Sequence, residues 1–119
     1  MLINAVISRL KSGSIRNIIA FSDYDEPPPV PYVVVKSESG IVENTQQVRI
    51  MVHNSKGRMD EIRHYTIIEL EQLLGDYVYD DEGNRYKLTK SGFTDITPER
   101  DDQTYFMERI YLSPTPGIY

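Results

Sequence analysis

The chain has no cysteine and no tryptophan among its 119 residues. The absence of cysteine excludes disulfide bonds, thiolate metal ligands and cysteine nucleophiles together. No apolar run approaches the ~20 residues that a bilayer-spanning helix needs, so we expect no membrane partner. Basic residues are also few, 13 against 18 acidic ones. The resulting formal charge of −5 argues against tight binding of nucleic-acid phosphates, which depends on Lys and Arg.

What the chain does contain is enough apolar sequence for one ordinary hydrophobic core. Hydrophobic residues make up 39% and charged residues 26% of the chain, as in globular rather than disordered proteins. We therefore expect a single domain over residues 1–119. Residues 1–112 should form the folded core. Residues 113–119, which include two prolines, should form an extended C-terminal tail.

Two segments show the apolar spacing of amphipathic helices. The first covers residues 2–11, and its apolar side consists of Leu2, Ile3, Val6, Ile7 and Leu10. The second starts near Arg58 and ends before Gly75, because glycine commonly terminates a helix. The apolar stripe of this longer helix, widened by Ile67, consists of Met59, Ile62, Thr66, Leu70, Leu73 and Leu74.

Runs of β-branched or alternating residues predict the strands. They lie at 32–36, 47–53, 77–79, 85–88 and 104–112, with a shorter strand expected within 15–21. In the second of these runs, Val48, Ile50 and Val52 alternate with their neighbours, which predicts one buried face. The order of elements indicates an α+β fold: a mostly antiparallel β-sheet flanked by an N-terminal helix and one long amphipathic helix.

No group of residues has the sequence spacing of a catalytic or metal site. The only histidines, His53 and His64, are far apart in sequence and lack a zinc-motif spacing, so we interpret both as surface residues. A weak metal or acid–base site with Asp60 or Glu61 is the alternative. The acidic residues around 80–84 lack the register of a calcium loop and suit a hairpin turn. We therefore expect no catalytic residue, no metal and no cofactor.

The last predicted strand is apolar on both of its faces. In a monomer of this size we expect one face of such a strand to be exposed to solvent. Apolar residues on both faces therefore indicate that one face contacts another subunit. Nine tyrosines are also many for this length, and tyrosine is enriched at interfaces. With the tail included, the predicted interface residues are Tyr105, Met107, Tyr111, Pro114, Pro116 and Tyr119.

Four segments together resemble the tail terminator (tail completion) proteins of long-tailed bacteriophages. These segments are the helix at 2–11, the proline-led strand at 31–35, the strand–turn–helix at 48–74 and the final strand at 106–111. More broadly, they are similar to the small head–tail joining proteins of the phage neck. This family is recognised by its layout and has no diagnostic catalytic signature.

The resemblance implies a structural virion protein that caps the tail tube as a ring, commonly a hexamer, and has no catalytic residues. Its partners would be the tail tube protein and a head-completion or connector protein, assembled in the host cytoplasm. A ring of six copies at −5 each carries −30, so an acidic lumen would let DNA pass without specific binding. The lumen-facing candidates are Asp80, Asp81, Glu82, Asp101 and Asp102.

Other functions stay open from the sequence. Another neck protein, such as a head-completion protein or connector, would have a similar layout. A cellular binding module that recruits a partner through the proline loop or a sheet edge would be a stable monomer. A small hydrolase would use His53 or His64 with an acidic neighbour.

Overall fold

The computed structural model describes residues 1–39, 45–75, 77–99 and 103–114. Its helical segments are α1 (Leu2–Leu10), η1 (Phe21–Asp23), η2 (Lys56–Arg58), α2 (Met59–Arg63), η3 (His64–Glu69) and α3 (Leu70–Leu74). Its strands are β1 (Ile18–Ala20), β2 (Tyr32–Ser39), β3 (Thr45–Ser55), β4 (Tyr77–Tyr79), β5 (Arg85–Lys87), β6 (Thr89–Phe93), β7 (Thr97–Pro98) and β8 (Thr104–Pro114). The predicted α+β fold is confirmed.

The main sheet has the strand order β1-β2-β3-β8-β6, and β7 also pairs with β8. All of its pairs are antiparallel except β1–β2, which is parallel. The longest pairing joins β3 and β8 over eleven residues each, from Thr45 opposite Pro114 to Ser55 opposite Thr104. A separate hairpin of β4 and β5 matches the predicted hairpin.

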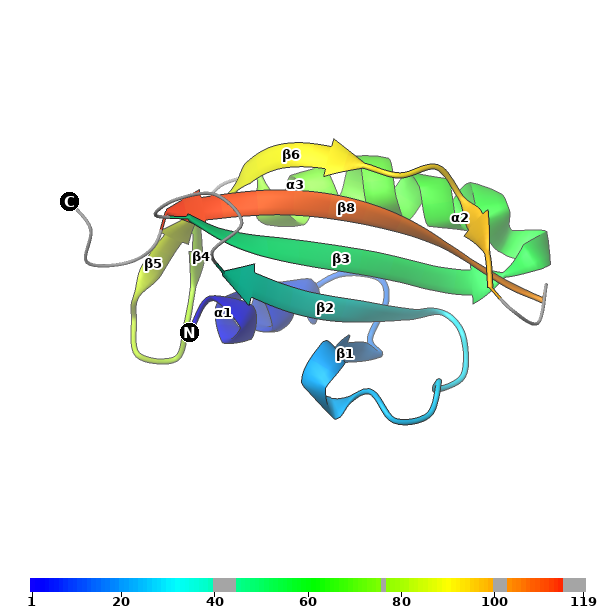
Figure 1. Cartoon of the computed structure of the whole chain (residues 1–119), viewed down its shortest axis with the longest axis horizontal. Coiled ribbons are helices and arrows are strands. Elements are labelled where there is room, and N and C mark those ends of the chain that lie inside the picture. Colours follow the sequence, from blue (N-terminus) through cyan, green and yellow to red (C-terminus); the bar gives the residue numbers. More distant parts are fainter. Residues whose placement is uncertain (40–44, 76, 100–102, 115–119) are drawn as a thin grey trace.

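α1 and the run from η2 to α3 lie on one side of this sheet, where the hydrophobic core forms (Figure 1). Because side chains alternate along a strand, every second residue of the central strands points into that core. As predicted, Val48, Ile50 and Val52 of β3 are buried there. Residues of β2, α1 and the long helical segment complete the core, among them Val33, Val35, Leu2, Val6, Leu10, Ile62, Leu70 and Leu74.

The segment from η2 to α3 is one continuous helical run whose middle six residues, η3, form a π-helix. The predicted stripe is confirmed at Ile62, Thr66, Leu70 and Leu74, which are all buried. The prediction that Ile67 widens this stripe is wrong, since its side chain is 39% exposed. A π-helix has more residues per turn than an α-helix. Each residue still advances the helical run by roughly a quarter of a turn, so Ile67, one position after the buried Thr66, lies at the solvent edge of the stripe.

Two strand boundaries also differ from the prediction. β2 continues to Ser39, past the predicted end at residue 36, and β3 begins at Thr45, before the predicted start at residue 47. β8 runs through Ser113 and Pro114, so ordered structure extends past the predicted end of the core at residue 112. Ser113 is 1% exposed, which shows that this residue belongs to the packed part of the chain and not to a tail.

A buried arginine joins the sheet to the π-helix. The Nη1 atom of Arg109, on β8, donates hydrogen bonds to the carbonyl oxygens of Thr66 at 2.8 Å and Ile67 at 3.0 Å. Replacing α-helical by π-helical hydrogen bonding leaves a carbonyl without its ordinary partner, and the guanidinium supplies one. Arg109 is only 7% exposed, so water cannot easily replace it.

We predict that Arg109→Met lowers the free energy of unfolding by about 2–3 kcal/mol, because it leaves two buried carbonyls without a charged donor. Urea denaturation followed by circular dichroism measures this change. Arg63→Met is the matched control: its side chain lies on the exposed surface of the same helical run, and we expect a change within about 0.5 kcal/mol. Equal effects of the two substitutions would contradict the role given to Arg109.

Candidate functional site

The face of the sheet opposite α1 and the long helical run is covered by neither of them (Figure 1). The short η1 lies at the β1 edge of this face, where Lys36 Nζ lies 4.6 Å from the centre of the Phe21 ring. We call this surface the open face. Strand register assigns to it Tyr32, Val34, Lys36, Glu38, Gln47, Arg49, Met51, His53, Phe106, Glu108, Ile110 and Leu112. Four of its apolar side chains are only partly buried: Met51, Phe106, Ile110 and Leu112. The open face therefore combines buried side chains, Tyr32 and Val34 among them, with apolar side chains that remain partly accessible to a partner.

Charged side chains connect three strands across the middle of the open face. The Arg49 guanidinium lies 2.9 Å from Glu108 on β8 and 3.7 Å from Glu38 on β2. Lys36 adds a contact of 3.2 Å to Glu38. The hydrogen bond to Glu108 raises the pKa of Arg49. Because Glu108 is only 6% exposed, this pair is more than a solvated surface ion pair, most of which contribute little.

At one end of the open face four aromatic rings form a row across the strands. Tyr32 stacks on His53 with ring centroids 4.5 Å apart, and His53 stacks on Phe106 at 5.3 Å. Tyr24, which follows η1, stacks on the outer side of Tyr32 at 6.3 Å. The row joins β2, β3 and β8 with pairs of the kind that stabilise sheets.

The histidine in this row corrects one prediction. His53 is 7% exposed, so its interpretation as a surface residue is wrong, whereas His64 is exposed as predicted. The Nδ1 atom of His53 contacts the Glu99 carboxylate, not Asp60 or Glu61, the acidic neighbours considered from sequence. Burial lowers the pKa of His53 although Glu99 opposes the shift. The sequence carries no signal for this pair, because Glu99 lies 46 residues away, beyond the helical run and the β4–β5 hairpin.

The predicted interface residues of the last strand do not form one surface. Met107 and Tyr111 are 2% and 1% exposed and belong to the chain's own core, so the prediction of subunit contact is wrong for both. Tyr105 is half-buried against this core, and Pro114 is exposed at the end of β8. Pro116 and Tyr119 lie outside the described residues. The face of β8 that helices leave uncovered is instead that of Phe106, Ile110 and Leu112.

The acidic residues predicted to face a lumen differ in their exposure to solvent. Asp81 and Glu82 are exposed on the β4–β5 turn, whereas Asp101 and Asp102 lie outside the described residues. The prediction for Asp80 is corrected, because its side chain has no exposed surface. Its carboxylate organises the turn and accepts hydrogen bonds from the backbone N–H groups of Glu82 and Asn84, the Asn84 amide, the Tyr86 hydroxyl and the amino group of Met1.

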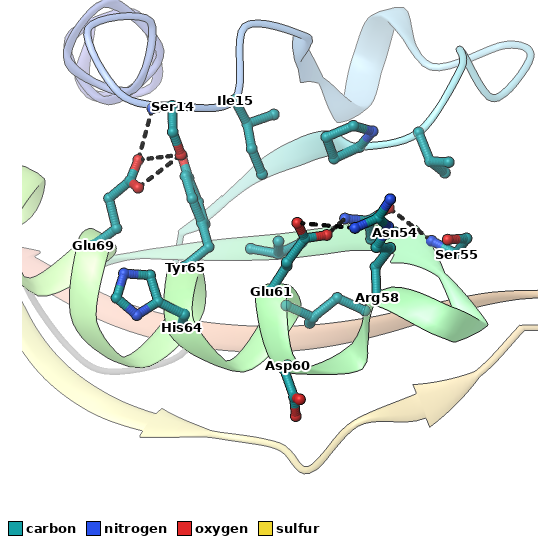
Figure 2. Close-up of a pocket in the computed structure, with 14 residues that line it drawn as sticks. Ser14, Ile15, Asn54, Ser55, Arg58, Asp60, Glu61, His64, Tyr65 and Glu69 are labelled. Atoms are coloured by element: carbon teal, nitrogen blue, oxygen red, sulfur yellow. Dashed lines mark hydrogen bonds and ion pairs between the residues drawn. The ribbon is translucent and has the colours of Figure 1, made fainter.

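On the helix side, a cavity of about 820 Å³ opens between the helical run and two loop segments, 14–15 and 30–31. Figure 2 shows Glu61, Tyr65 and Glu69 pointing from the helical run toward the segment that carries Ser14 and Ile15. The Glu69 carboxylate accepts hydrogen bonds from the Ser14 backbone N–H at 2.7 Å and from its hydroxyl at 2.7 and 2.8 Å. These bonds hold the two sides of the cavity together.

Glycine allows this close approach of loop and helix. A Cβ atom at Gly13 would lie 2.8 Å from Glu69 Oε2 and 2.8 Å from a methyl carbon of Leu73, which is closer than side chains tolerate. The residue before Ser14 must therefore be small for Glu69 to reach the loop. Nothing in the local sequence around Ser14 indicates this partner, which lies 55 residues away.

Within residues 1–39, 45–75, 77–99 and 103–114, no group of three or more His, Cys, Asp or Glu side chains is arranged to hold a metal ion. None of the helices in these ranges is long and apolar enough to cross a membrane.

No protein-family model matches the chain, and it matches no curated protein.

We predict that acidification from pH 7 to pH 5 destabilises the protein through His53. Its pKa in the folded state lies below the ordinary value of 6.5, so the unfolded chain binds the proton first. This contribution to stability is complete above pH 6.5 and decreases as the pH falls. His53→Phe keeps an aromatic ring in the row and should reduce the loss, as measured by urea denaturation at both pH values. His64→Gln is the control, and an equal reduction there would contradict the assignment.

We predict a second, more acidic transition at the β4–β5 turn. Burial alone raises the pKa of Asp80, but hydrogen bonds from Asn84, the Met1 amino group and Tyr86 outweigh it and hold the pKa well below 3.8. The stabilisation is complete above pH 3.8 and is lost as the pH falls further. Asp80→Asn should lower the urea midpoint at pH 7 and flatten its dependence on pH below 4. Asp81→Asn, on the same turn, should behave like the unsubstituted protein. If the urea midpoint of Asp80→Asn depended on pH as that of the unsubstituted protein does, the role given to Asp80 would be refuted.

Proposed function

We propose that this chain is a structural subunit of a tailed-phage virion, a tail terminator that caps the tail tube as an oligomeric ring. Another neck protein, a head-completion protein or connector, is the alternative within the same class. The proposal places the protein at the joint between tail and head, after assembly in the host cytoplasm. Its partners there are the tail tube protein and a head-completion or connector protein, with DNA passing through the lumen.

The observation that carries the proposal is the one-sided covering of the sheet. α1 and the long helical run pack on one face of the sheet. On the opposite, open face the side chains of Met51, Phe106, Ile110 and Leu112 are only partly buried. Partly exposed apolar side chains rimmed by charges are typical of contact surfaces between proteins. An assembly subunit needs such a surface, because its contacts with neighbours and with the tube must come from its own exterior.

Two further observations support an assembly role. The element order of the fold, helix, strands, long helix, hairpin and final strand, is the layout that the resemblance to tail terminators implies. The exposed carboxylates of Asp81 and Glu82 project from a turn, where they are available to face a lumen and repel the phosphates of passing DNA.

The first experiment is light scattering of the purified protein over a wide concentration range, with negative-stain images of any large species. We expect a closed ring of about six copies with a central hole, as the resemblance implies. A monomer at every concentration contradicts self-assembly into a ring and favours a binding module with one discrete partner.

We predict that Ile110→Lys blocks ring formation without unfolding the chain. Ile110 lies opposite Arg49 in the β3–β8 ladder, so the added cation faces another cation on the open face. Because Ile110 is only partly buried, the urea midpoint should change little. Ile68→Lys, on the exposed side of the helical run at 44% exposure, is the matched control and should assemble normally. Normal rings from Ile110→Lys would exclude the open face from subunit contact.

A further inference from the structure

The cavity beside the helical run contains a buried polar atom without a partner. Tyr65 is 3% exposed, and its hydroxyl has no hydrogen-bond partner among the described residues. Buried tyrosine hydroxyls usually find one, since an unpaired buried polar group is costly. Burial, with a smaller contribution from Glu69, raises the pKa of Tyr65. The hydroxyl therefore keeps its proton and is available as a donor to a ligand in the cavity.

The charge around this hydroxyl is unbalanced. Glu69 is held by Ser14 and makes no ion pair within the described part of the chain. A carboxylate has about four lone-pair positions, so the bonds from Ser14 leave room for a cation. Glu61 differs, because Arg58 lies 3.6 Å from it. The cavity thus offers the Glu69 carboxylate, which has no cationic partner among the described residues, next to the Tyr65 hydroxyl, which has no acceptor there.

Five apolar side chains line part of the cavity: Ile15, Val30, Pro31, Val52 and Ile62. The polar residues Asn54, Ser55, Arg58, Asp60 and His64 complete the lining. Glu61, Tyr65 and Glu69 lie along one line of the helical run, and eight residues of helix span about 12 Å. An extended peptide covers that distance with about four residues. The lining therefore has the length, the apolar surface and the polar groups for a short peptide and is larger than a single ion needs.

We propose that this cavity binds an extended segment of another protein in which an apolar residue adjoins a lysine or arginine. The apolar side chain packs on Ile15 and Val30, the cation pairs with Glu69, and a backbone carbonyl of the segment accepts a hydrogen bond from Tyr65. Because this chain is itself acidic, at −5, a basic segment of a different protein complements the site better than a second copy. The site does not depend on ring formation.

The test is an NMR titration of the ¹⁵N-labelled full chain with blocked tetrapeptides. The binding probe has a central leucine–lysine pair, and the two matched probes replace lysine by glutamate or leucine by serine. We expect saturable amide shifts at residues 14–15 and 61–69 with the leucine–lysine peptide. Both matched probes should bind about tenfold more weakly, since each lacks one of the two complementary groups.

Three variants distinguish this site from non-specific binding. Glu69→Gln keeps an acceptor for Ser14 but removes the charge, and we expect about tenfold weaker binding of the leucine–lysine peptide and no preference over the glutamate peptide. Tyr65→Phe should weaken all three peptides by a few-fold. Glu71→Gln, on the same helical run and paired with Lys90, is the control and should leave binding unchanged.

Two results would overturn the inference. One is the absence of shifts at residues 14–15 and 61–69 up to the solubility limit of the leucine–lysine peptide. The other is equal binding of all three peptides with no effect of Glu69→Gln, which would indicate a general apolar cavity. Neither result bears on the proposal of ring formation, which light scattering tests separately.

Discussion

The pairing of β3 with β8 is the constraint on which the rest of the structure depends. Eleven residues of each strand pair in one register, and a shift by a single residue would exchange the two faces. This register directs Val52 and Met107 into the core, and it directs His53 and Phe106 to the open face. The position of the helices, the ionic network and the aromatic row all follow from it.

Local sequence patterns were sufficient to predict the main helices and strands, but not which face of each strand is buried. The helix at 2–10 and the central strands β2, β3 and β8 follow from apolar spacing alone, whereas β6 and β7 were not predicted. The last strand, however, is apolar on both sides, so periodicity could not decide which side meets the helices. The prediction of Met107 and Tyr111 as contact residues is wrong for this reason. Their face of β8 packs with Val48, Val52 and the helical run in the core. The other face of β8, with Phe106 and Ile110, belongs to the open face.

The polar features that sequence reasoning missed all join residues far apart in the chain. Arg109 binds carbonyls of the π-helix 42 and 43 residues away, and His53 contacts Glu99 46 residues away. Asp80 was identified as part of an acidic turn, but its contact with the Met1 amino group gives it a buried structural position. Single-residue patterns cannot predict such pairs, because the partner is chosen by topology and not by local spacing.

The fold separates two kinds of surface that a small assembly protein would use differently. The open face is broad, crosses three central strands and combines apolar side chains with charges that already pair among themselves, such as Arg49 with Glu108. The cavity is on the opposite, helix-covered side and holds polar groups that are not fully satisfied, above all Tyr65 and Glu69. A surface whose charges are internally paired can be covered by a partner without leaving an uncompensated buried charge. A cavity with an unused donor and an unpaired carboxylate suits a specific, complementary segment. The two surfaces can therefore be occupied at the same time, by neighbouring subunits on one side and a partner's segment on the other.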